Sequence, residues 1–411
     1  MVYQPPAGAR DLLPLDVAQK RWIEDRLQQM FHQWGYHRII TSTLERLDTL
    51  MAGGAIQRST VLQLQGLDEE DLGLRPELTA SIARTVVTRM AGATYPLRLY
   101  YNANIFRRAQ ETSHTRQQEF YQAGVELLGS GGLLADAETL LLLMDCLQSL
   151  ELRQWSIVLG EAGLTRSLLS VFPSPIQSRV RQAIATLDRI ALETLPMSQE
   201  LRDRALLLLD LRGTPTEVFQ KISSLDLNPT QQTALDNLKS LIDLLQTTPD
   251  TGHRTPYSLV LDLSLIQTLD YYTGIVFEVI GDTPNGRQVL GQGGRYDQLL
   301  GLYHPQGETA PGIGFALQIE QLHQAIALTN QIPQHIPTSD WLVVPVSPQA
   351  YTAALAHTQQ LRTTSDTVRV ELDLGGRTPA EIHDYAQHRQ IAAIAWISPD
   401  GTAKIEPVKL E

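Results

Sequence analysis

Residues 98–128 read RLYYNANIFRRAQETSHTRQQEFYQAGVELL, two runs rich in apolar and aromatic residues on either side of a polar stretch. This pattern predicts two β-strands joined by a loop. Side chains two residues apart in a strand face the same way, so Gln122, Gly124 and Glu126 share one surface. Gln122 and Glu126 then flank a notch at Gly124, and an amide beside a carboxylate suits a small ligand with an ammonium group. On this strand alone, a solvated face of an antiparallel sheet is an equal alternative.

The composition is that of an ordinary globular protein, with 43% hydrophobic and 19% charged residues in a chain of 411. This length has room for about two or three domains. The formal net charge is −12 and no run of Lys and Arg occurs, which argues against tRNA or another polynucleotide as a tightly held partner. The single cysteine, Cys146, lies in a leucine-rich segment and is expected to be a buried apolar side chain in a reducing compartment.

Several classes of protein are disfavoured by what the sequence lacks. No basic segment followed by an apolar one opens the chain, and no apolar run approaches the roughly 20 residues of a membrane span. We therefore expect a cytoplasmic protein without a membrane partner. The ten histidines are scattered, and the motifs CxxC, HExxH and GxSxG do not occur. We predict no metal site, no cofactor and no acyl-transfer catalysis.

The first part of the chain mixes helices with short strands. A helix is predicted to begin after the cap Asp16 and to end at Gly35, and HRIITSTLE (37–45) is predicted to be a strand. Residues 61–77 predict two short strands, with the acidic cluster Asp68 to Asp71 at their turn. Adjacent acidic residues on a turn point apart, so this cluster is interpreted as a solvated loop.

A second helix is predicted over residues 78–90, which leaves Glu77 and Thr79 at its start. The carboxylate of Glu77 can complement the helix dipole there or face a binding site, and this pattern favours neither. A strongly apolar helix is expected over residues 133–150.

A helical insertion is predicted from about residue 153 to 256, including amphipathic helices over 176–190 and 235–245. Strands rich in β-branched and aromatic residues return over 257–281. The glycines of GQGGRYD (291–297) are interpreted as a tight turn, and a phosphate-binding loop is the weaker alternative.

The fold class is therefore α+β, an antiparallel sheet with flanking helices and a helical insertion, within a core of residues 1–330. The segment 331–339, with two prolines, is predicted to be a linker. Residues 340–411 alternate strand, helix, strand, helix, strand, which predicts a small α/β domain.

Several segments, in one order, resemble the class II catalytic core of histidyl-tRNA synthetase: GARDLLP, TSTLE, LRPELTA, FRR followed by EFYQAGVELLG, LDYYTGIVFE, GQGGRYDQLL and PGIGFALQIEQL. The resemblance runs from about residue 8 to 325 and implies a class II aminoacyl-tRNA synthetase-like sheet. The domain of residues 340–411 resembles a shortened anticodon-binding domain of that family.

The resemblance implies a histidine-binding pocket. Its residues, by matching position, are Glu77, Thr79, Gln122, Glu126, Tyr271 and Tyr272, and the Arg107 of motif 2 is also kept. This pocket agrees with the surface that strand alternation assigns to Gln122 and Glu126.

The positions that activate ATP in the family depart from its pattern. Ala109 stands where a carboxylate would read adenine, and Gln118 replaces an arginine. Gln267 and Thr268 stand at the position of a catalytic arginine, and Gln321 at that of the arginine that holds the γ-phosphate. Each change from Arg to Gln removes a full charge and a bidentate donor from the developing charge on phosphate. We therefore expect no useful formation of histidyl adenylate.

A synthetase fold with a kept histidine pocket and a dismantled ATP site resembles the regulatory subunits of ATP phosphoribosyltransferase. The resemblance implies a non-catalytic subunit that binds the short form of the catalytic subunit, and that is needed for its activity and for feedback inhibition by histidine in histidine biosynthesis. The alternatives are a divergent histidyl-tRNA synthetase or amino-acid adenylate-forming ligase, and a stand-alone histidine sensor. The resemblance also implies a homodimer within a larger hetero-oligomer, although Ser42 replaces the usual proline of motif 1.

Overall fold

The structure is a computed structural model that describes residues 3–54, 56–65, 70–108, 117–248, 257–266, 271–329 and 331–409. The chain divides into two compact units, residues 1–333 and 334–411, which are described separately.

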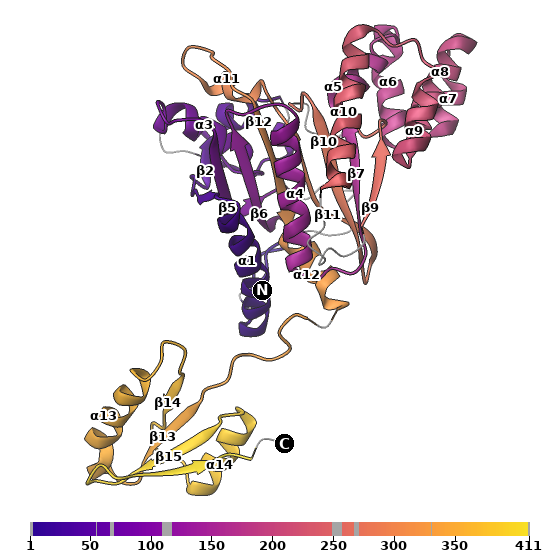
Figure 1. Cartoon of the computed structure of the whole chain (residues 1–411). Helices are drawn as coiled ribbons and strands as arrows, with labels where there is room; N and C mark the ends of the chain where they lie inside the picture. Colours follow the sequence, from indigo (N-terminus) through magenta and orange to yellow (C-terminus); the bar gives the residue numbers. More distant parts are fainter. Residues whose placement is uncertain are drawn as a thin grey trace. The chain divides into compact units, whose positions relative to one another are not determined.

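A nine-stranded sheet, within the described residues, forms the centre of the first unit in the order β1-β5-β6-β12-β11-β10-β7-β9-β8 (Figure 1). Only the pairs β1 with β5 and β7 with β9 are parallel among these described strands. The strands are β1 His37–Arg38, β5 Leu97–Phe106, β6 Glu119–Leu128, β7 Trp155–Glu161, β8 Arg212–Gly213, β9 Ser258–Asp262, β10 Ile275–Thr283, β11 Gly286–Arg295 and β12 Gly312–Gln318. This sheet, flanked by helices, confirms the predicted α+β class.

The predicted hairpin forms the second and third strands of this sheet. β5 and β6 pair antiparallel, with Tyr101 opposite Gly124 and Leu99 opposite Glu126. On its other side β6 pairs with β12, where Gly314 lies opposite Glu126. Glu126 is therefore carried by a strand that has neighbours on both edges, which fixes the position of its backbone.

One face of the sheet is covered by α1 (Pro14–Gln33), α4 (Leu133–Ser149) and α12 (Ile319–Ala327). The apolar side chains of β6 on this side, Val125 and Leu127, join the large core beneath these helices. Cys146 of α4 is fully buried in the same core, as predicted.

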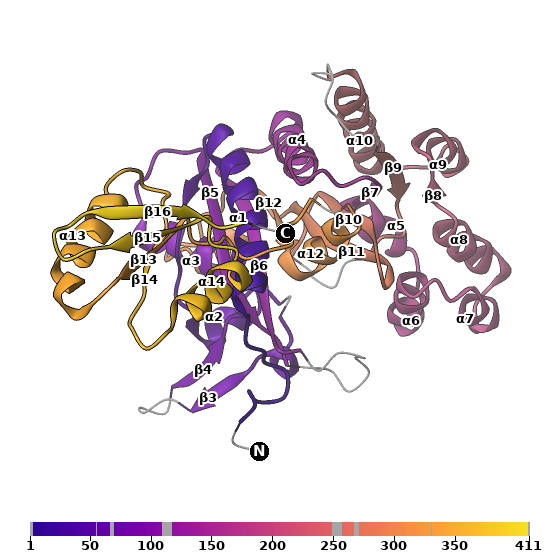
Figure 2. The same cartoon turned by 90° about the horizontal axis from the view of Figure 1, so that it is seen from below.

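The other face packs against α3 (Thr79–Arg89) and α11 (Leu299–Tyr303). The strands β2, β4 and β3 form a separate three-stranded sheet in that order, and Figure 2 labels its strands β3 and β4. The remaining elements of this region are β2 Leu44–Arg46, α2 Leu47–Met51, the 3-10 helix η1 Arg58–Thr60, β3 Gln63–Gln65 and β4 Asp71–Leu74. Residues 66–69, which include Asp68 of the acidic cluster, lie outside the described residues.

The helical insertion follows β7, and Figures 1 and 2 show its helices gathered beside β7, β8 and β9. They are α5 Ala162–Leu169, α6 Ser174–Ala185, α7 Arg189–Thr194, α8 Gln199–Leu209, α9 Pro215–Ile222 and α10 Pro229–Thr247. The predicted start at about residue 153 is wrong, because β7 is a strand of the central sheet. All seven residues of β7 are buried, so no alternation of polar and apolar residues marked it as a strand.

Two helix predictions are corrected at their ends. The helix predicted over 176–190 stops at Ala185, because Leu187 takes a φ of +54° and a new helix begins at Arg189. Asp16 is the third residue of α1, not its cap, and its carboxylate accepts a hydrogen bond of 2.9 Å from the Leu13 amide.

The strand predicted over residues 37–45 is also wrong as a single element. His37–Arg38 pairs with β5 in the central sheet, whereas Leu44–Arg46 pairs with β4 in the small sheet. The segment passes from one sheet to the other, so its residues cannot keep one alternating pattern.

The glycines interpreted as a tight turn lie inside strand β11, between β10 and β12. A Cβ atom on Gly293 would lie 2.3 Å from the carbonyl oxygen of Gly314 and 2.6 Å from the ring of Phe277. The glycines are needed because neighbouring strands and rings approach closely here.

The second unit has a four-stranded sheet, within the described residues, in the order β14-β13-β15-β16. Its elements are β13 Trp341–Pro345, η2 Pro348–Ala350, α13 Tyr351–Arg362, β14 Val370–Leu372, α14 Pro379–His388, β15 Ala393–Ile397 and β16 Ala403–Pro407. The alternation predicted up to β15 is confirmed, and the final strand β16 was not predicted. None of the described helices combines the length and the apolar composition that a membrane span needs.

Candidate functional site

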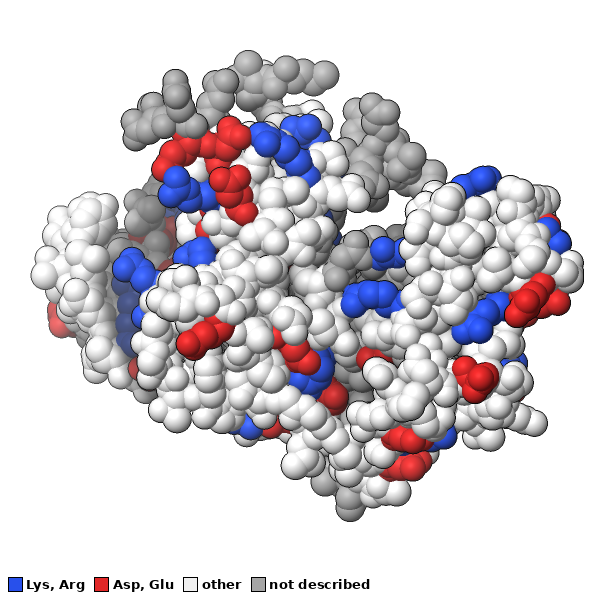
Figure 3. Space-filling model, turned by 90° about the horizontal axis from the view of Figure 1, so that it is seen from above, with Lys and Arg blue, Asp and Glu red and all other residues white. Residues whose placement is uncertain are grey.

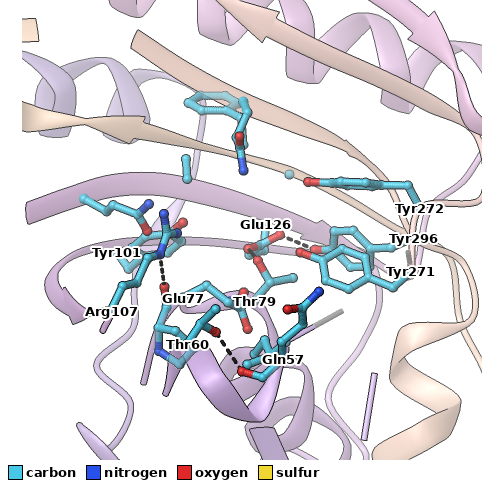
Figure 4. A pocket seen from close by; sticks show the side chains of 17 residues that line it. Gln57, Thr60, Glu77, Thr79, Tyr101, Arg107, Glu126, Tyr271, Tyr272 and Tyr296 are labelled. Atoms are coloured by element: carbon cyan, nitrogen blue, oxygen red, sulfur yellow. Dashed lines mark hydrogen bonds between the residues drawn. The ribbon is translucent and has the colours of Figure 1, made fainter. Parts of the chain in front are cut away.

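A cavity of about 280 Å³ opens beside β6, and its walls come from segments far apart in the sequence (Figure 4). The structure brings all seven predicted site residues to this cavity: Glu77, Thr79, Arg107, Gln122, Glu126, Tyr271 and Tyr272. Whether they bind histidine stays a prediction at this point.

Glu126 lies at the centre of the polar wall and is 1% exposed. Thr79 Oγ1 donates a hydrogen bond of 2.7 Å to its Oε1, and the Tyr296 hydroxyl donates to its Oε2. Burial raises the pKa of Glu126 to about 8, because desolvation outweighs these two hydrogen bonds. Gly314 makes room for this carboxylate, since a Cβ there would lie 2.0 Å from Oε2.

The notch expected at Gly124 is not open. A Cβ atom at this position would lie 2.6 Å from the hydroxyl of Tyr101 and 2.2 Å from the carbonyl oxygen of Phe315. The ring of Tyr101, from the directly opposite position on β5, fills the space that the missing side chain leaves. The prediction of an empty notch is therefore wrong. The ring of Tyr101 occupies this space and forms part of the cavity wall.

Glu77 caps α3 and also lines the cavity. Its Oε2 accepts 2.7 Å from the Thr79 amide, and its Oε1 accepts 2.9 Å from the Ala80 amide. Burial raises the pKa of Glu77, although these amide hydrogen bonds act in the opposite direction. The sequence left open whether Glu77 complements the helix dipole or faces a binding site. In the structure its carboxylate does both, because it accepts from the first amides of α3 and also lines the cavity.

Arg107 supplies the cationic side of the cavity. Its Nε donates 2.9 Å to the carbonyl oxygen of Pro76, which orients the guanidinium next to the start of α3 (Figure 4). Burial lowers the pKa of Arg107, and the negative charge of Glu77 acts in the opposite direction. A buried guanidinium in this setting is a ready partner for a ligand carboxylate.

Gln122 is 2% exposed and points into the cavity from β6. Its Oε1 has no hydrogen-bond partner within the part of the chain that the structure describes. An unpaired buried acceptor costs about 1–3 kcal/mol, so a ligand donor at this position would recover that free energy.

Tyrosines form the apolar wall. The rings of Tyr271 and Tyr272 lie 4.8 Å apart, and Tyr296 meets Tyr271 edge-on at 5.7 Å. Burial raises the pKa of all three phenols, so they stay neutral hydrogen-bond donors at physiological pH. Such a wall suits a small aromatic or imidazole ring.

Sequence reasoning missed several lining residues: Ile56, Gln57, Thr60, Tyr101, Gln292, Tyr296 and Phe315. Tyr296 lies in the GGRYD part of the family motif, and Tyr101 lies in the predicted hairpin. The sequence therefore marked the segments of these two residues, although not their place in the cavity lining. Gln57 and Thr60 come from the irregular segment around η1, where no periodicity marks a site.

The positions that depart from the synthetase pattern are only partly described. Gln118 donates 3.2 Å to the carbonyl oxygen of Ala7, and Gln321 lies on α12 and is absent from the described lining of the cavity. Ala109, Gln267 and Thr268 lie outside the described residues.

The sequence and the fold were compared with known proteins. A family model for histidyl-tRNA synthetase matches residues 8–322. The crystal structure of apo S. aureus histidyl-tRNA synthetase has a TM-score of 0.69, covering 98% of this chain and 97% of that chain at 24% identity, a likeness of fold. Fold and site together define a class II, histidyl-tRNA synthetase-like protein.

Full-length relatives give a narrower assignment. The ATP phosphoribosyltransferase regulatory subunit of Nostoc punctiforme (strain ATCC 29133 / PCC 73102) is 65% identical over 409 residues, which is 100% of both chains. That of Gloeothece citriformis (strain PCC 7424) is 58% identical over 412 residues, again 100% of both. The crystal structure of an ATP phosphoribosyltransferase regulatory subunit/histidyl-tRNA synthetase from Bacillus halodurans C has a TM-score of 0.80 at 26% identity, covering 97% of this chain and 99% of that chain. The chain belongs to the family of ATP phosphoribosyltransferase regulatory subunits, and it is accordingly a non-catalytic subunit of an enzyme complex.

Proposed function

We propose that the chain binds histidine in the cavity beside β6 and transmits feedback inhibition to a short-form ATP phosphoribosyltransferase catalytic subunit, which also needs the chain for activity. The observation that carries the proposal is the unpaired Oε1 of buried Gln122, which lines the same cavity as the buried carboxylates of Glu77 and Glu126. Such acceptors suit the ammonium group of an amino acid, which donates hydrogen bonds and carries a positive charge.

The rest of the cavity complements the other parts of histidine. Arg107 can pair with the α-carboxylate, and the tyrosine wall can pack against the imidazole ring. A zwitterion is favoured over a simple cation because carboxylates and a guanidinium line the same cavity.

Inhibition then follows from linkage. A ligand shifts an equilibrium only by its differential affinity, so histidine must bind one arrangement of the complex more tightly than another. The proposed setting is the cytoplasm, in keeping with a single buried thiol.

The deciding experiment measures phosphoribosyl-ATP formation by the short catalytic subunit from the same organism, with and without this chain, across a histidine titration. We expect activity only with the chain, and a fall in that activity as histidine rises. No change on adding the chain would exclude the regulatory role. A Glu126→Gln complex that keeps full activity and full histidine sensitivity would place the inhibitory histidine elsewhere, for example at a subunit interface.

The adenylate-forming alternative is not favoured by the family assignment. Histidine-dependent exchange of pyrophosphate into ATP by the chain alone would revive it. We expect no such exchange, because the guanidiniums at positions 118 and 321 of the sequence are replaced by the amides of Gln118 and Gln321.

The second unit gives no support for tRNA binding. Arg377 pairs with Asp373 at 2.6 Å, and Arg389 lies 3.6 Å from Glu371. Both guanidiniums also approach the ring of Tyr385. These cations are engaged within the unit, so we propose that tRNA is not a partner.

We further propose a homodimer formed through the motif 1 segment. Ile40 is 80% exposed and Leu44 is 47% exposed, which leaves apolar surface beside the edge strand β1. Light scattering at micromolar concentration should give the dimer mass, and Ile40→Asp should shift it toward the monomer. Ile190→Asp, at an exposed apolar position on α7, is the matched control and should stay dimeric. A monomeric mass for the unchanged chain would contradict the proposal.

A further inference from the structure

A second cavity, of about 310 Å³, lies between the insertion helices and the central sheet. Its lining shares one described residue, Tyr272, with the histidine cavity. The walls are formed by Ala162, Thr165, Arg166, Leu169, Ser174, Gln177, Ser178, Arg181, Leu265, Ile266, Tyr272 and Val276. This volume is near the lower end of the range, about 300–1,000 Å³, that small-molecule sites occupy.

Two helices each present one face to this cavity. Residues 162, 165, 166 and 169 of α5 are spaced i, i+3, i+4 and i+7, and residues 174, 177, 178 and 181 of α6 repeat that spacing. Side chains at these intervals lie on one side of a helix. The cavity is thus the space between two matching helical faces.

Within the described lining the charged side chains are cationic, in a protein whose net charge is −12. Arg166 and Arg181 line the cavity, and no carboxylate does so among the described residues. The nearby Glu161 is occupied as the cap of α5, where its side chain accepts from the Leu164 amide. Figure 3 shows Lys and Arg side chains along the hollow on the side of the insertion helices.

Polar groups suited to an anion lie beside the arginines. Ser174 is the first residue of α6, so the positive end of that helix dipole is at the cavity, and Ser178 follows one turn later. Arg166 Nη2 donates 3.0 Å to the carbonyl oxygen of Tyr272, which holds the guanidinium at the cavity wall.

An apolar part of the lining comes from Leu169, Leu265, Ile266 and Val276. A ligand with an anionic group beside the arginines and an apolar body against these side chains would match both the cationic and the apolar parts of the lining. We propose that this cavity binds a small phosphate monoester with an apolar or aromatic body. A phosphate is favoured because two guanidiniums and a helix N-terminus can together serve a dianion with three free oxygens.

The test is the binding of phenyl phosphate to the full chain, measured by calorimetry without histidine and without the catalytic subunit. We expect Arg166→Gln and Arg181→Gln each to weaken binding roughly tenfold, as for loss of a charge-assisted contact. Arg179→Gln is the matched control, because Arg179 is exposed on α6 and is not part of this lining. All three arginines are exposed, so these variants should keep the melting temperature of the unchanged chain.

Other probes separate the parts of the proposal. Phenol should not bind measurably, and inorganic phosphate should bind more weakly than phenyl phosphate. Equal binding of benzoate would overturn the preference for phosphate, and binding unaffected by Arg166→Gln and Arg181→Gln would overturn the site. Since histidine is absent, failure here leaves the proposed histidine site untouched.

The shared Tyr272 predicts a link between the cavities. Saturating phenyl phosphate should change the histidine Kd of the chain at least about twofold, because Arg166 holds the backbone of Tyr272. An unchanged histidine Kd, in a chain that binds both ligands, would overturn this link.

Discussion

Replacing Glu126 with glutamine is expected to weaken histidine binding roughly 10- to 100-fold, because a hydrogen bond to a charged group contributes about 1.5–3 kcal/mol. The substitution removes the charge that faces the ligand ammonium while keeping the size of the side chain. One of the hydroxyls of Thr79 and Tyr296 can still donate to the remaining amide oxygen, and the other can rotate to accept from the new NH2 group, so the wall should keep its shape.

The same variant should show a smaller pH dependence of histidine binding, with the remainder due to Glu77, whose pKa is also raised by burial in this cavity. With the pKa of Glu126 raised to about 8, the empty site holds a proton at neutral pH that an incoming ammonium must expel. Histidine affinity should therefore fall by up to about tenfold for each pH unit below 8, and binding at pH 7 should release about one proton. Calorimetry in two buffers of different ionisation enthalpy measures that proton directly.

The stability of the empty chain gives an independent reading of the same pKa. The pKa of Glu126 is higher in the folded chain than in the unfolded chain. The protonated Glu126 carboxyl therefore makes its full contribution to the free energy of unfolding below about pH 4.5, and this contribution is lost as the pH rises through about 8. The melting temperature of Glu126→Gln should fall less between pH 5 and 8 than that of the unchanged chain. Glu320→Gln is the control for histidine binding, since Glu320 is also buried but lies outside the cavity lining. Burial raises the pKa of Glu320 as well, so this variant should share the smaller fall in melting temperature but keep its histidine affinity. Equal heats in both buffers for the unchanged chain would contradict a protonated Glu126.

Replacing Gly124 with alanine is expected to destabilise the protein by about 1–3 kcal/mol, the usual cost of adding a methyl group to a filled interior. Its Cβ would lie 2.2 Å from the backbone oxygen of Phe315 and 2.6 Å from the Tyr101 hydroxyl. Two strands would have to separate, since a backbone oxygen cannot move alone. Histidine binding should weaken as well, because Tyr101 lines the cavity.

Thermal unfolding compared with Gly131→Ala measures this cost. A Cβ atom added at Gly131 would lie 3.3 Å from its nearest described atoms, in the side chain of Pro311, which is a milder contact. We expect a clearly lower melting temperature for Gly124→Ala and a small change for Gly131→Ala. Equal melting temperatures would show that the strands around Gly124 are not closely packed.

The elements predicted well follow a recognisable pattern in the sequence. The strands β5 and β6 are runs rich in apolar and aromatic residues on either side of a polar stretch, α4 is a long apolar run, and α10 carries apolar residues at helical spacing. The predictions that failed lacked such a pattern. β7 is buried on both faces and therefore reads as continuous apolar sequence, and β11 is rich in glycine because its neighbours approach closely.

The candidate site shows the same division. The seven predicted residues reach one cavity because matching motifs preserve their positions in the fold. Tyr101 was not predicted, because its role depends on lying opposite Gly124 in the register of β5 with β6. Gln57 and Thr60 were not predicted, because an irregular segment brings them to the cavity.

The sequence by itself determined the fold class, the family resemblance and the loss of the cationic positions that ATP activation requires, because these depend on residue identity at given positions. Only the tertiary structure decided that Tyr101 fills the notch, that Oε1 of Gln122 is left without a described partner and that Glu126 is desolvated. Each of these depends on which side chains meet across strands distant in sequence, and burial by those neighbours is what raises the pKa of Glu126.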